Sequence, residues 1–274
     1  MLVSENIFML LDSNPSNDAV EKVALFESMI KGETFAFFDV EDFELIIEYY
    51  LELDFKKKAK EALEIALEQY PIDLVLTLIK IEFLNSSQRF DESLKVLNNL
   101  NKFHPNNIDV VLSLGRLYSL MDNVLYAFKY LSHAHDLISL DSTYNDHLQD
   151  LSYEFIQIGK FDSAINVLKQ ILSFKPNNET VMMELGVAYH ESGKFQESVN
   201  YFKEVIDGNP YSHVAWFNLA TIYNVNEDWK EAVFAYEMCL VINEKFTAAH
   251  YGKANSFIHL KEYQKAIESF NESF

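Results

Sequence analysis

The stretch ETVMMELGVAYHESGKFQESVNYFKEVIDGNPYS, residues 179–212, decides the fold of this chain. It contains two apolar patterns of helical spacing, separated by Ser192-Gly193-Lys194 and closed by Pro210. Apolar residues at offsets of three and four lie on one face of an α-helix, and a proline cannot continue a helix. The stretch therefore predicts two amphipathic helices joined by a short turn.

The pattern recurs every 34 residues along the chain. Two pairs of prolines keep this spacing: Pro71 with Pro105, and Pro176 with Pro210. A small residue returns with the same period, once three extra residues near Ser142 are allowed for, at Ala59, Ser93, Ala127, Ala164, Ser198, Ala232 and Ala266. Such a period is typical of a repeat array, whose stacked units form a long exposed surface and not one enclosed pocket.

The register divides the chain into a terminal cap and an array. Residues 1–39 do not keep the period; there Ser16 predicts the start of a helix over roughly 17–31, which Gly32 ends, and we interpret this segment as an amino-terminal helical cap. The array covers 40–274, with expected repeats at 40–73, 74–107, 108–144, 145–178, 179–212, 213–246 and an incomplete 247–274.

Two departures from the register predict local irregularities. Phe55 precedes Ala59 by four residues, whereas the aromatic residue of later repeats precedes the small residue by three. The turn of the first repeat is therefore expected to be distorted. The three extra residues around 140–144 predict a kink or a longer loop between the third and fourth repeats.

Charge and composition exclude several classes of protein. The chain of 274 residues has 22 basic and 42 acidic residues, and its surface offers no basic stripe for a phosphate backbone, so we expect no nucleic-acid partner. No apolar run approaches the roughly 20 residues that span a bilayer, so we expect no membrane partner. The single cysteine and the absence of a cationic start before an apolar run favour a cytoplasmic protein.

The sequence gives little support for catalysis. It has no Gly-rich phosphate loop, and its carboxylates follow helix faces instead of gathering in a pair. His133 and His135 are two residues apart and would point away from each other on a helix, unlike a metal-binding pair. Cys239 occupies a small slot of the repeat and is interpreted as a packing thiol. We expect no enzyme activity, no catalytic residue, no metal and no cofactor.

Two copies of the repeat carry a family resemblance. The matching positions are Leu185, Gly186, Tyr189, Gly193, Phe195, Ser198, Phe202 and Pro210 in one copy, and Trp216, Leu219, Ala220, Tyr223, Trp229, Ala232 and Tyr236 in the next. This order resembles the tetratricopeptide repeat. The resemblance implies an all-α, right-handed α-solenoid of about six and a half helical hairpins. It also implies a protein-binding scaffold, in which the first helix of each repeat lines a concave groove for an extended peptide or a partner helix.

Mapping that groove onto the sequence gives a candidate binding stripe. Met183, Phe217 and Tyr251 are separated by 34 residues and should form a ladder. With their neighbours on the same helix faces, the candidate residues are Met183, Val187, His190, Phe217, Asn218, Thr221, Asn224, Tyr251 and Asn255. Rings supply contact area and amides can bond a peptide backbone. The alternative is that these rings pack on their own neighbours.

The amino-terminal part of the same surface is acidic. Glu44 and Glu48 stand on it with further glutamates, which favours a basic segment of a partner or, equally, an ordinary solvated helix face. Arg116 is the cation of the central stripe; it is expected either to meet an acidic group of a ligand or to pair with Asp109 or Asp150.

The sequence leaves other readings of the function open. It stops inside the second helix of the seventh copy, and solenoids need a polar terminal cap for solubility. We therefore expect either a fragment of a longer protein or an end that packs against a second copy to form a homodimer. The alternatives to a peptide-binding scaffold are a self-assembling structural module and the non-catalytic part of a longer regulatory protein or enzyme.

Overall fold

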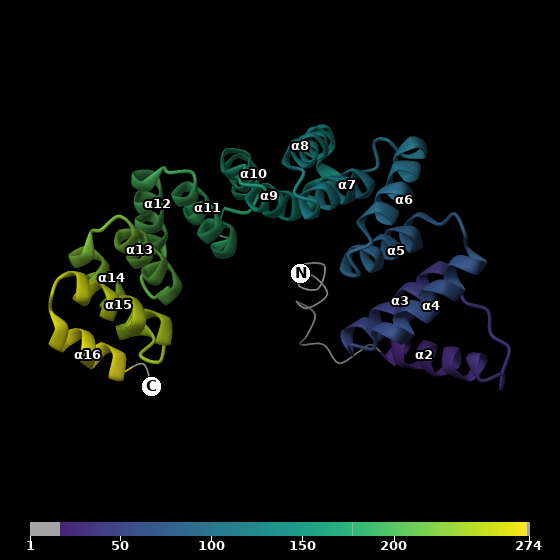
Figure 1. Cartoon of the computed structure of the whole chain (residues 1–274), viewed down its shortest axis with the longest axis horizontal. Coiled ribbons are helices and arrows are strands. Elements are labelled where there is room, and N and C mark those ends of the chain that lie inside the picture. Colours follow the sequence, from purple (N-terminus) through teal and green to yellow (C-terminus); the bar gives the residue numbers. More distant parts are fainter. Residues whose placement is uncertain (1–16, 177, 273–274) are drawn as a thin grey trace. The chain divides into compact units, whose positions relative to one another are not determined.

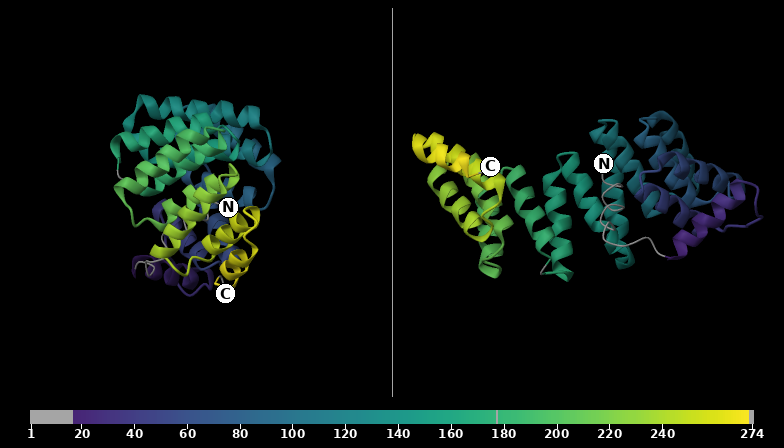
Figure 2. Two further views of the ribbon diagram at one scale, coloured as in Figure 1. Left: turned by 90° about the vertical axis from the view of Figure 1, so that its left-hand side faces the viewer. Right: turned by 90° about the horizontal axis from the view of Figure 1, so that it is seen from below.

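Every regular element in the described part of the chain is a helix. The computed structural model describes residues 17–176 and 178–272, and in these ranges it contains fifteen α-helices and one short 3-10 helix (Figure 1). The helices form successive hairpins, as in Figure 2. The all-α class and the α-solenoid architecture predicted from the period are thus confirmed.

The chain divides after Asn123 into two compact units, and each is considered by itself. The first unit contains α2 (Asn17–Ile30), α3 (Val40–Glu52), α4 (Lys56–Gln69), α5 (Leu74–Ser86), α6 (Phe90–Phe103) and α7 (Ile108–Leu120). The second contains α8 (Val124–Leu140), η1 (Ser142–His147), α9 (Leu148–Gln157), α10 (Phe161–Phe174), α11 (Glu179–Glu191), α12 (Phe195–Gly208), α13 (His213–Val225), α14 (Trp229–Ile242), α15 (Thr247–His259) and α16 (Tyr263–Asn271).

Polar side chains begin the first helix of most hairpins. Asp39 accepts a hydrogen bond from the backbone N–H of Asp42 at 2.8 Å, and Asp42 accepts one from the N–H of Asp39 at 3.3 Å. Equivalent caps begin α5, α7, α11 and α13, at Asp73, Asn107, Asn178 and Ser212. These caps satisfy backbone donors that have no partner within the helix, which explains where the helices start.

The turn inside each hairpin has a residue with positive φ. Gly159 and Gly193 adopt this conformation, as expected of glycines after a helix end. In the other hairpins the same place is held by Asp54, Gln88, Asp122, Glu227 and Lys261, with φ between 55° and 66°. Left-handed backbone is unfavourable for residues with a Cβ atom. Four of these turns, at Asp54, Gln88, Glu227 and Lys261, join helices that pack on each other within one unit, and this packing compensates for the unfavourable backbone.

The turn of the first repeat is regular, so the distortion predicted from Phe55 is wrong. Phe55 has φ −85° and ψ 54°, and the equivalent Arg89 has φ −88° and ψ 55°. Helix α4 begins at Lys56, three residues before Ala59, just as α6 begins three residues before Ser93. The backbone needs no aromatic residue at that position, because the conformation of Asp54 sets the turn and Phe55 is half exposed.

The three extra residues lengthen a helix. Helix α8 has 17 residues, whereas α6, α10, α12 and α14 each have 14. The 3-10 helix η1 follows, and its first turn is capped by Asp141, which accepts a hydrogen bond from the N–H of Thr143 at 2.9 Å. The three extra residues are therefore absorbed by the longer helix α8, and not by the longer loop that was one of the two expectations. The 3-10 helix η1 takes the place of a loop and of the first turn of α9, which has only 10 residues.

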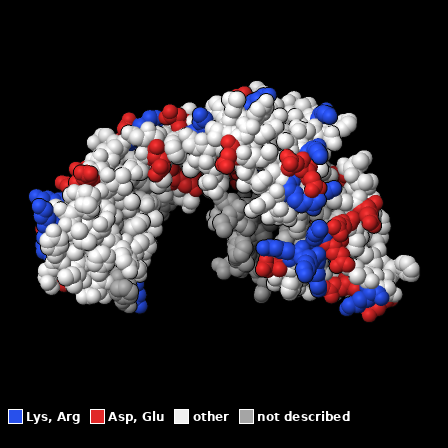
Figure 3. All heavy atoms as spheres, viewed as in Figure 1, with Lys and Arg blue, Asp and Glu red and all other residues white. Residues whose placement is uncertain are grey.

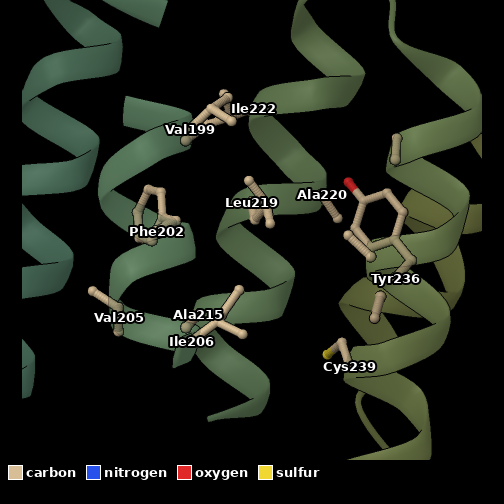
Figure 4. Packing of buried hydrophobic residues seen from close by; sticks show 13 residues of the cluster. Val199, Phe202, Val205, Ile206, Ala215, Leu219, Ala220, Ile222, Tyr236 and Cys239 are labelled. Carbon is tan, nitrogen blue, oxygen red and sulfur yellow. The ribbon is translucent and has the colours of Figure 1, made fainter. Parts of the chain in front are cut away.

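Small residues lie where the hairpins pack most closely. Ala164, Ser198 and Ala232 are completely buried, and the Ser198 hydroxyl donates a hydrogen bond to the Gly186 carbonyl at 2.7 Å. Figure 4 shows the apolar cluster that residues of α12 to α15 form, including Phe202 of α12, Leu219 of α13 and Tyr236 of α14. Close packing of this kind leaves no room for a larger side chain, which explains the recurring small residue.

Helix α2 packs on the first hairpin through aromatic rings. The Phe26 ring lies edge-on to Phe38, with centroids 5.6 Å apart, and to Phe43, at 6.1 Å. All three rings are buried. The helix ends at Ile30 and is followed by Gly32 with φ 74°, close to the predicted end, whereas the predicted cap Ser16 lies outside the described residues.

Candidate partner-binding surfaces

The candidate stripe of the second unit starts on α11. Val187 is 40% exposed, whereas Met183 is half-buried and packs against the apolar cluster of α12 to α15. The Nδ1 atom of His190 is buried and has no hydrogen-bond partner. A buried polar atom without a partner is costly, so His190 is a place where a new hydrogen bond would stabilise the protein.

On α13 the predicted ladder residue is part of the core. The Phe217 ring lies edge-on to Phe246, with centroids 5.0 Å apart, and is tilted against Tyr236 at 5.9 Å. Phe217 is half-buried between them. The Phe217 ring therefore packs on its own neighbours, which was the alternative to a ligand-binding role. Part of its surface still faces solvent.

Two polar residues of α13 bind within the protein. The Thr221 hydroxyl donates to the Phe217 carbonyl at 2.9 Å and lies 3.4 Å from the Tyr236 hydroxyl. The Asn224 side-chain oxygen accepts a hydrogen bond from the hydroxyl of Ser256 on α15, at 2.9 Å. These bonds link α13 to α14 and α15. The polar groups of Thr221 and Asn224 therefore already have partners within the protein, and these bonds fix the position of α13.

The exposed part of the stripe lies mainly on α15. Tyr251 is 44% exposed, and its ring is edge-on to Phe270 at 5.5 Å. Asn255, one turn later, is exposed, and Asn218 on α13 is half-buried. We call the nine candidate residues of this unit the aromatic stripe. Val187, Tyr251 and Asn255 are the most accessible of the nine in the structure.

The candidate glutamates of the first unit influence one another. We call Glu41, Glu44, Glu48 and Glu52 of α3 the acidic stripe. Burial and then the carboxylates of Glu48, Asp73 and Glu41 raise the pKa of Glu44. Partial burial and then the carboxylate of Glu52 raise the pKa of Glu48. Mutual repulsion of this kind would be relieved by a cation, since an opposite charge favours the ionised carboxylates.

Arg116 pairs within the first unit with a residue that the sequence analysis did not name as its partner. Its guanidinium Nη1 lies 3.7 Å from Oε1 of Glu82. The side chains of Arg116 and Glu82 are 25% and 30% exposed. They stand one repeat period apart, on α7 and α5, so the pair links neighbouring repeats. Charged side chains are plentiful over the first unit in the view of Figure 3.

One groove of the second unit was missed by the sequence analysis. It lies between α12 and α14, its floor is formed by α13, and its volume is about 520 Å³. The signal was present in the register, because Ala235 of α14 stands one period after Tyr201 of α12. Ala235 contributes to the lining of the groove as a small, buried residue, whereas the preceding repeat has a large one at this position.

The described residues show few groups suited to chemistry. Cys239 is buried, and burial raises the pKa of its thiol to about 11. The thiolate is the reactive form, so this cysteine serves packing, as predicted. Within residues 17–176 and 178–272, no three acidic, histidine or cysteine side chains form a metal-binding group. In the same ranges no helix is long and apolar enough to cross a membrane.

Comparison with known proteins agrees with this geometry. The family model of the tetratricopeptide repeat matches residues 150–213 and 191–238. Residues 150–238 of this chain are tetratricopeptide repeats. A solved tetratricopeptide repeat protein from Parabacteroides merdae is 14% identical and has a TM-score of 0.56, and the alignment covers 94% of this chain and 93% of that one. At this identity the likeness shows the fold alone.

Two further solved structures resemble parts of the chain. YrrB, described as a tetratricopeptide repeat protein with an unusual peptide-binding site, is 15% identical with a TM-score of 0.49, covering 73% of this chain and 98% of YrrB. MamA from Desulfovibrio magneticus is 14% identical with a TM-score of 0.46, covering 61% of this chain and 92% of that one. No curated protein sequence matches the chain.

Proposed function

We propose that this protein is a non-catalytic scaffold that binds an extended peptide or a helix of a partner protein along the first helices of its repeats. The observation that carries the proposal is the exposed Tyr251, which follows Phe217 and Met183 at the repeat period on a tetratricopeptide fold. Partially exposed rings at regular spacing give a long ligand several anchors. The general part of this proposal, protein binding, agrees with the match to the tetratricopeptide repeat family.

The accessible residues of the aromatic stripe suit a peptide. The Tyr251 ring offers apolar area, and the Asn255 amide, one turn further along α15, can both donate to and accept from a peptide backbone. Thr221 and Asn224 already bond within the protein. The bond between Asn224 and Ser256 joins α13 to α15 and keeps the two helices in place for a ligand.

The acidic stripe of the first unit suits a different part of a partner. Burial, and then neighbouring carboxylates, raise the pKa of Glu44 and Glu48, so a lysine or arginine of the partner would gain from their charge and favour their ionised forms. We therefore propose that the first unit binds a basic segment. Replacing Glu44 and Glu48 by glutamine should then weaken binding mainly at low salt, because screening reduces exposed charge interactions.

The proposal is tested by capture of partners from cell extract followed by mass spectrometry. A Tyr251→Ala, Asn255→Ala double variant should lose partners that the native protein retains. The matched control is Tyr211→Ala, which removes an 81% exposed tyrosine from a turn outside the stripe and should keep them. Phe217 is unsuited to this test because its ring packs in the core. Identical partners in all three proteins, with unchanged helix content, would reject the aromatic stripe.

A second candidate function is self-assembly through α16. Ile267 is 53% exposed, whereas Val199, two periods earlier, is 2% exposed. No described helix covers Ile267 as later helices cover Val199, and an apolar side chain at this position would gain from burial against a second copy. Sedimentation over a range of concentrations tests this candidate. A dimer that Ile267→Asp disrupts supports it, and a monomer at every concentration rejects it.

A further inference from the structure

The hairpin of α15 and α16 contains a buried histidine of which only one ring nitrogen has a hydrogen-bond partner. His250 lies near the start of α15 and is 5% exposed. Its Nε2 atom lies 2.8 Å from the backbone carbonyl of Glu244, in the turn before the helix. Its Nδ1 atom is buried and has no hydrogen-bond partner. A buried polar atom without a partner is costly, so a change that gave Nδ1 a hydrogen bond would stabilise this hairpin.

The Glu244 carbonyl decides which nitrogen of the neutral ring carries the hydrogen. A carbonyl oxygen only accepts, so the hydrogen belongs on Nε2, and Nδ1 keeps a lone pair. The nearest carboxylate oxygen, Oε2 of Glu272, lies 3.4 Å from Nδ1, and Glu272 directly follows the last residue of α16. A lone pair and an ionised carboxylate are both acceptors. The neutral ring therefore forms no hydrogen bond with Glu272.

A second proton on the ring changes this contact. Both nitrogens of an imidazolium ring donate, so Nε2 keeps its bond to Glu244 while Nδ1 donates to the Glu272 carboxylate. A hydrogen bond between opposite charges is stronger than one between neutral groups. Histidine is also the side chain that commonly gains its proton between about pH 8 and pH 5. Acidification over this range therefore supplies the bond that Nδ1 lacks.

One further charge lies beside this contact. The ammonium group of Lys253, on the same helix as His250, lies 3.5 Å from Oε2 of Glu272. Lys253 attracts the carboxylate whether or not the ring is charged, and its own charge opposes the second proton. Among the residues that the structure describes, no other charged side chain of α13, α14 or α16 forms an ion pair with His250 or Glu272. Glu272 contacts Nδ1 directly, so it is the group that gains a bond from the proton.

We propose that protonation of His250 fastens the end of α16 to α15, so that this hairpin is held more tightly near pH 6 than near pH 8. We call the pair of His250 and Glu272 the clamp. Only the closed hairpin places the Glu272 carboxylate at Nδ1, so the closed form binds the proton more strongly than an open form does. Acidification therefore favours the closed hairpin, and this gain is lost as the pH rises.

The clamp lies beside an accessible ring of the aromatic stripe. Tyr251 follows His250 directly, and Phe270 precedes Glu272 by two residues. The rings of Tyr251 and Phe270 meet edge-on, with centroids 5.5 Å apart. Fastening the end of α16 therefore also holds Phe270 against Tyr251. If the stripe binds partners as proposed above, on which this consequence rests, partner binding at Tyr251 will depend on pH.

The first test follows the proton by NMR of the histidine rings between pH 5 and pH 8. The His250→Gln variant identifies the His250 signal by its loss. Glu272→Gln replaces a carboxylate whose side chain is 57% exposed and should move the titration of the His250 ring to lower pH. The matched control is Glu268→Gln, which changes an exposed carboxylate of α16 that accepts a hydrogen bond from Gln264 at 3.3 Å. It should leave the His250 titration unchanged.

The second test measures amide hydrogen exchange of α16 at pH 6 and pH 8, corrected for the intrinsic effect of pH. In the native protein α16 should exchange about threefold more slowly at pH 6, as expected of one partly exposed ion pair. His250→Gln and Glu272→Gln should abolish the difference between the two pH values, and Glu268→Gln should retain it.

Three results would overturn the proposal. The first is a His250 ring that gains no proton between pH 5 and pH 8. The second is a His250 titration that Glu272→Gln leaves unchanged. The third is equal corrected exchange of α16 at both pH values in the native protein, as expected if Lys253 alone holds Glu272. Neither test uses a partner, so a failure of the clamp is distinct from a failure of the aromatic stripe, which partner capture tests.

Discussion

Adding one methyl group at Gly186 should destabilise the protein, although glycine is a poor helix former. A Cβ atom at Gly186 would lie 2.5 Å from Cζ and 2.6 Å from Cε2 of Phe202. Carbon atoms pack favourably at about 3.5–4.0 Å, so the ring would have to move by about 1 Å. Phe202 is fully buried within the cluster of Figure 4, so a movement of its ring would displace the side chains that pack around it.

The magnitude follows from two opposing effects. Replacing glycine by alanine inside a helix stabilises it by about 1 kcal/mol. Overpacking a buried site costs about 1–3 kcal/mol, and the upper part of this range applies because two ring atoms are approached closely. We therefore expect Gly186→Ala to lower the free energy of unfolding by about 1–2 kcal/mol.

The assay is urea unfolding followed by circular dichroism, and the chain supplies its own control. Gly208 of α12 has nothing within 4 Å of its Cβ position, so Gly208→Ala should be neutral or stabilising by up to about 1 kcal/mol. In a Phe202→Leu background, where the ring is gone, Gly186→Ala should no longer destabilise. A Gly186→Ala protein as stable as the native one would refute the close approach of α11 and α12.

Three further predictions concern separate features. Burial raises the pKa of Glu184, so ionisation of this carboxyl lowers the stability of the fold as the pH rises through the folded-state pKa. The Glu184→Gln variant should therefore be more stable than the native protein at pH 7, and the difference should vanish below about pH 4.5. Thermal melts at several pH values test this. Cys239, with its pKa near 11, should react with a thiol reagent at pH 8 only after urea unfolding, and rapid labelling of the native protein would contradict its burial. Glu227→Gly should stabilise the protein by about 1 kcal/mol, because glycine adopts the φ of 66° in the turn before α14 without steric cost. A lower urea midpoint for the variant would contradict this, since the Glu227 side chain would then stabilise the fold by more than its backbone conformation costs.

Local and periodic features of the fold were predictable from the sequence. Pro210, Gly193 and the buried Ser198 each act within one hairpin, and the repetition of such positions at 34 residues predicted the stack of hairpins. The turn at Phe55 was mispredicted because the aromatic residue was taken as its determinant, whereas the backbone of Asp54 sets it. The geometry of a turn depends on how the two flanking helices pack, and the spacing of residues in the sequence does not contain this information.

The sequence by itself determined that helical hairpins form and repeat, because helix spacing, caps and breaking residues act over a few positions. Only the tertiary structure decided which side chains remain free for a partner. Phe217 and Tyr251 have equivalent positions in the repeat, yet Phe217 packs against Phe246 whereas Tyr251 stays 44% exposed. Likewise, residues of α12, α13 and α14 that lie apart in the sequence come together to line one groove. Such differences arise between helices, where the neighbours of each side chain are set by packing and not by its place in the period.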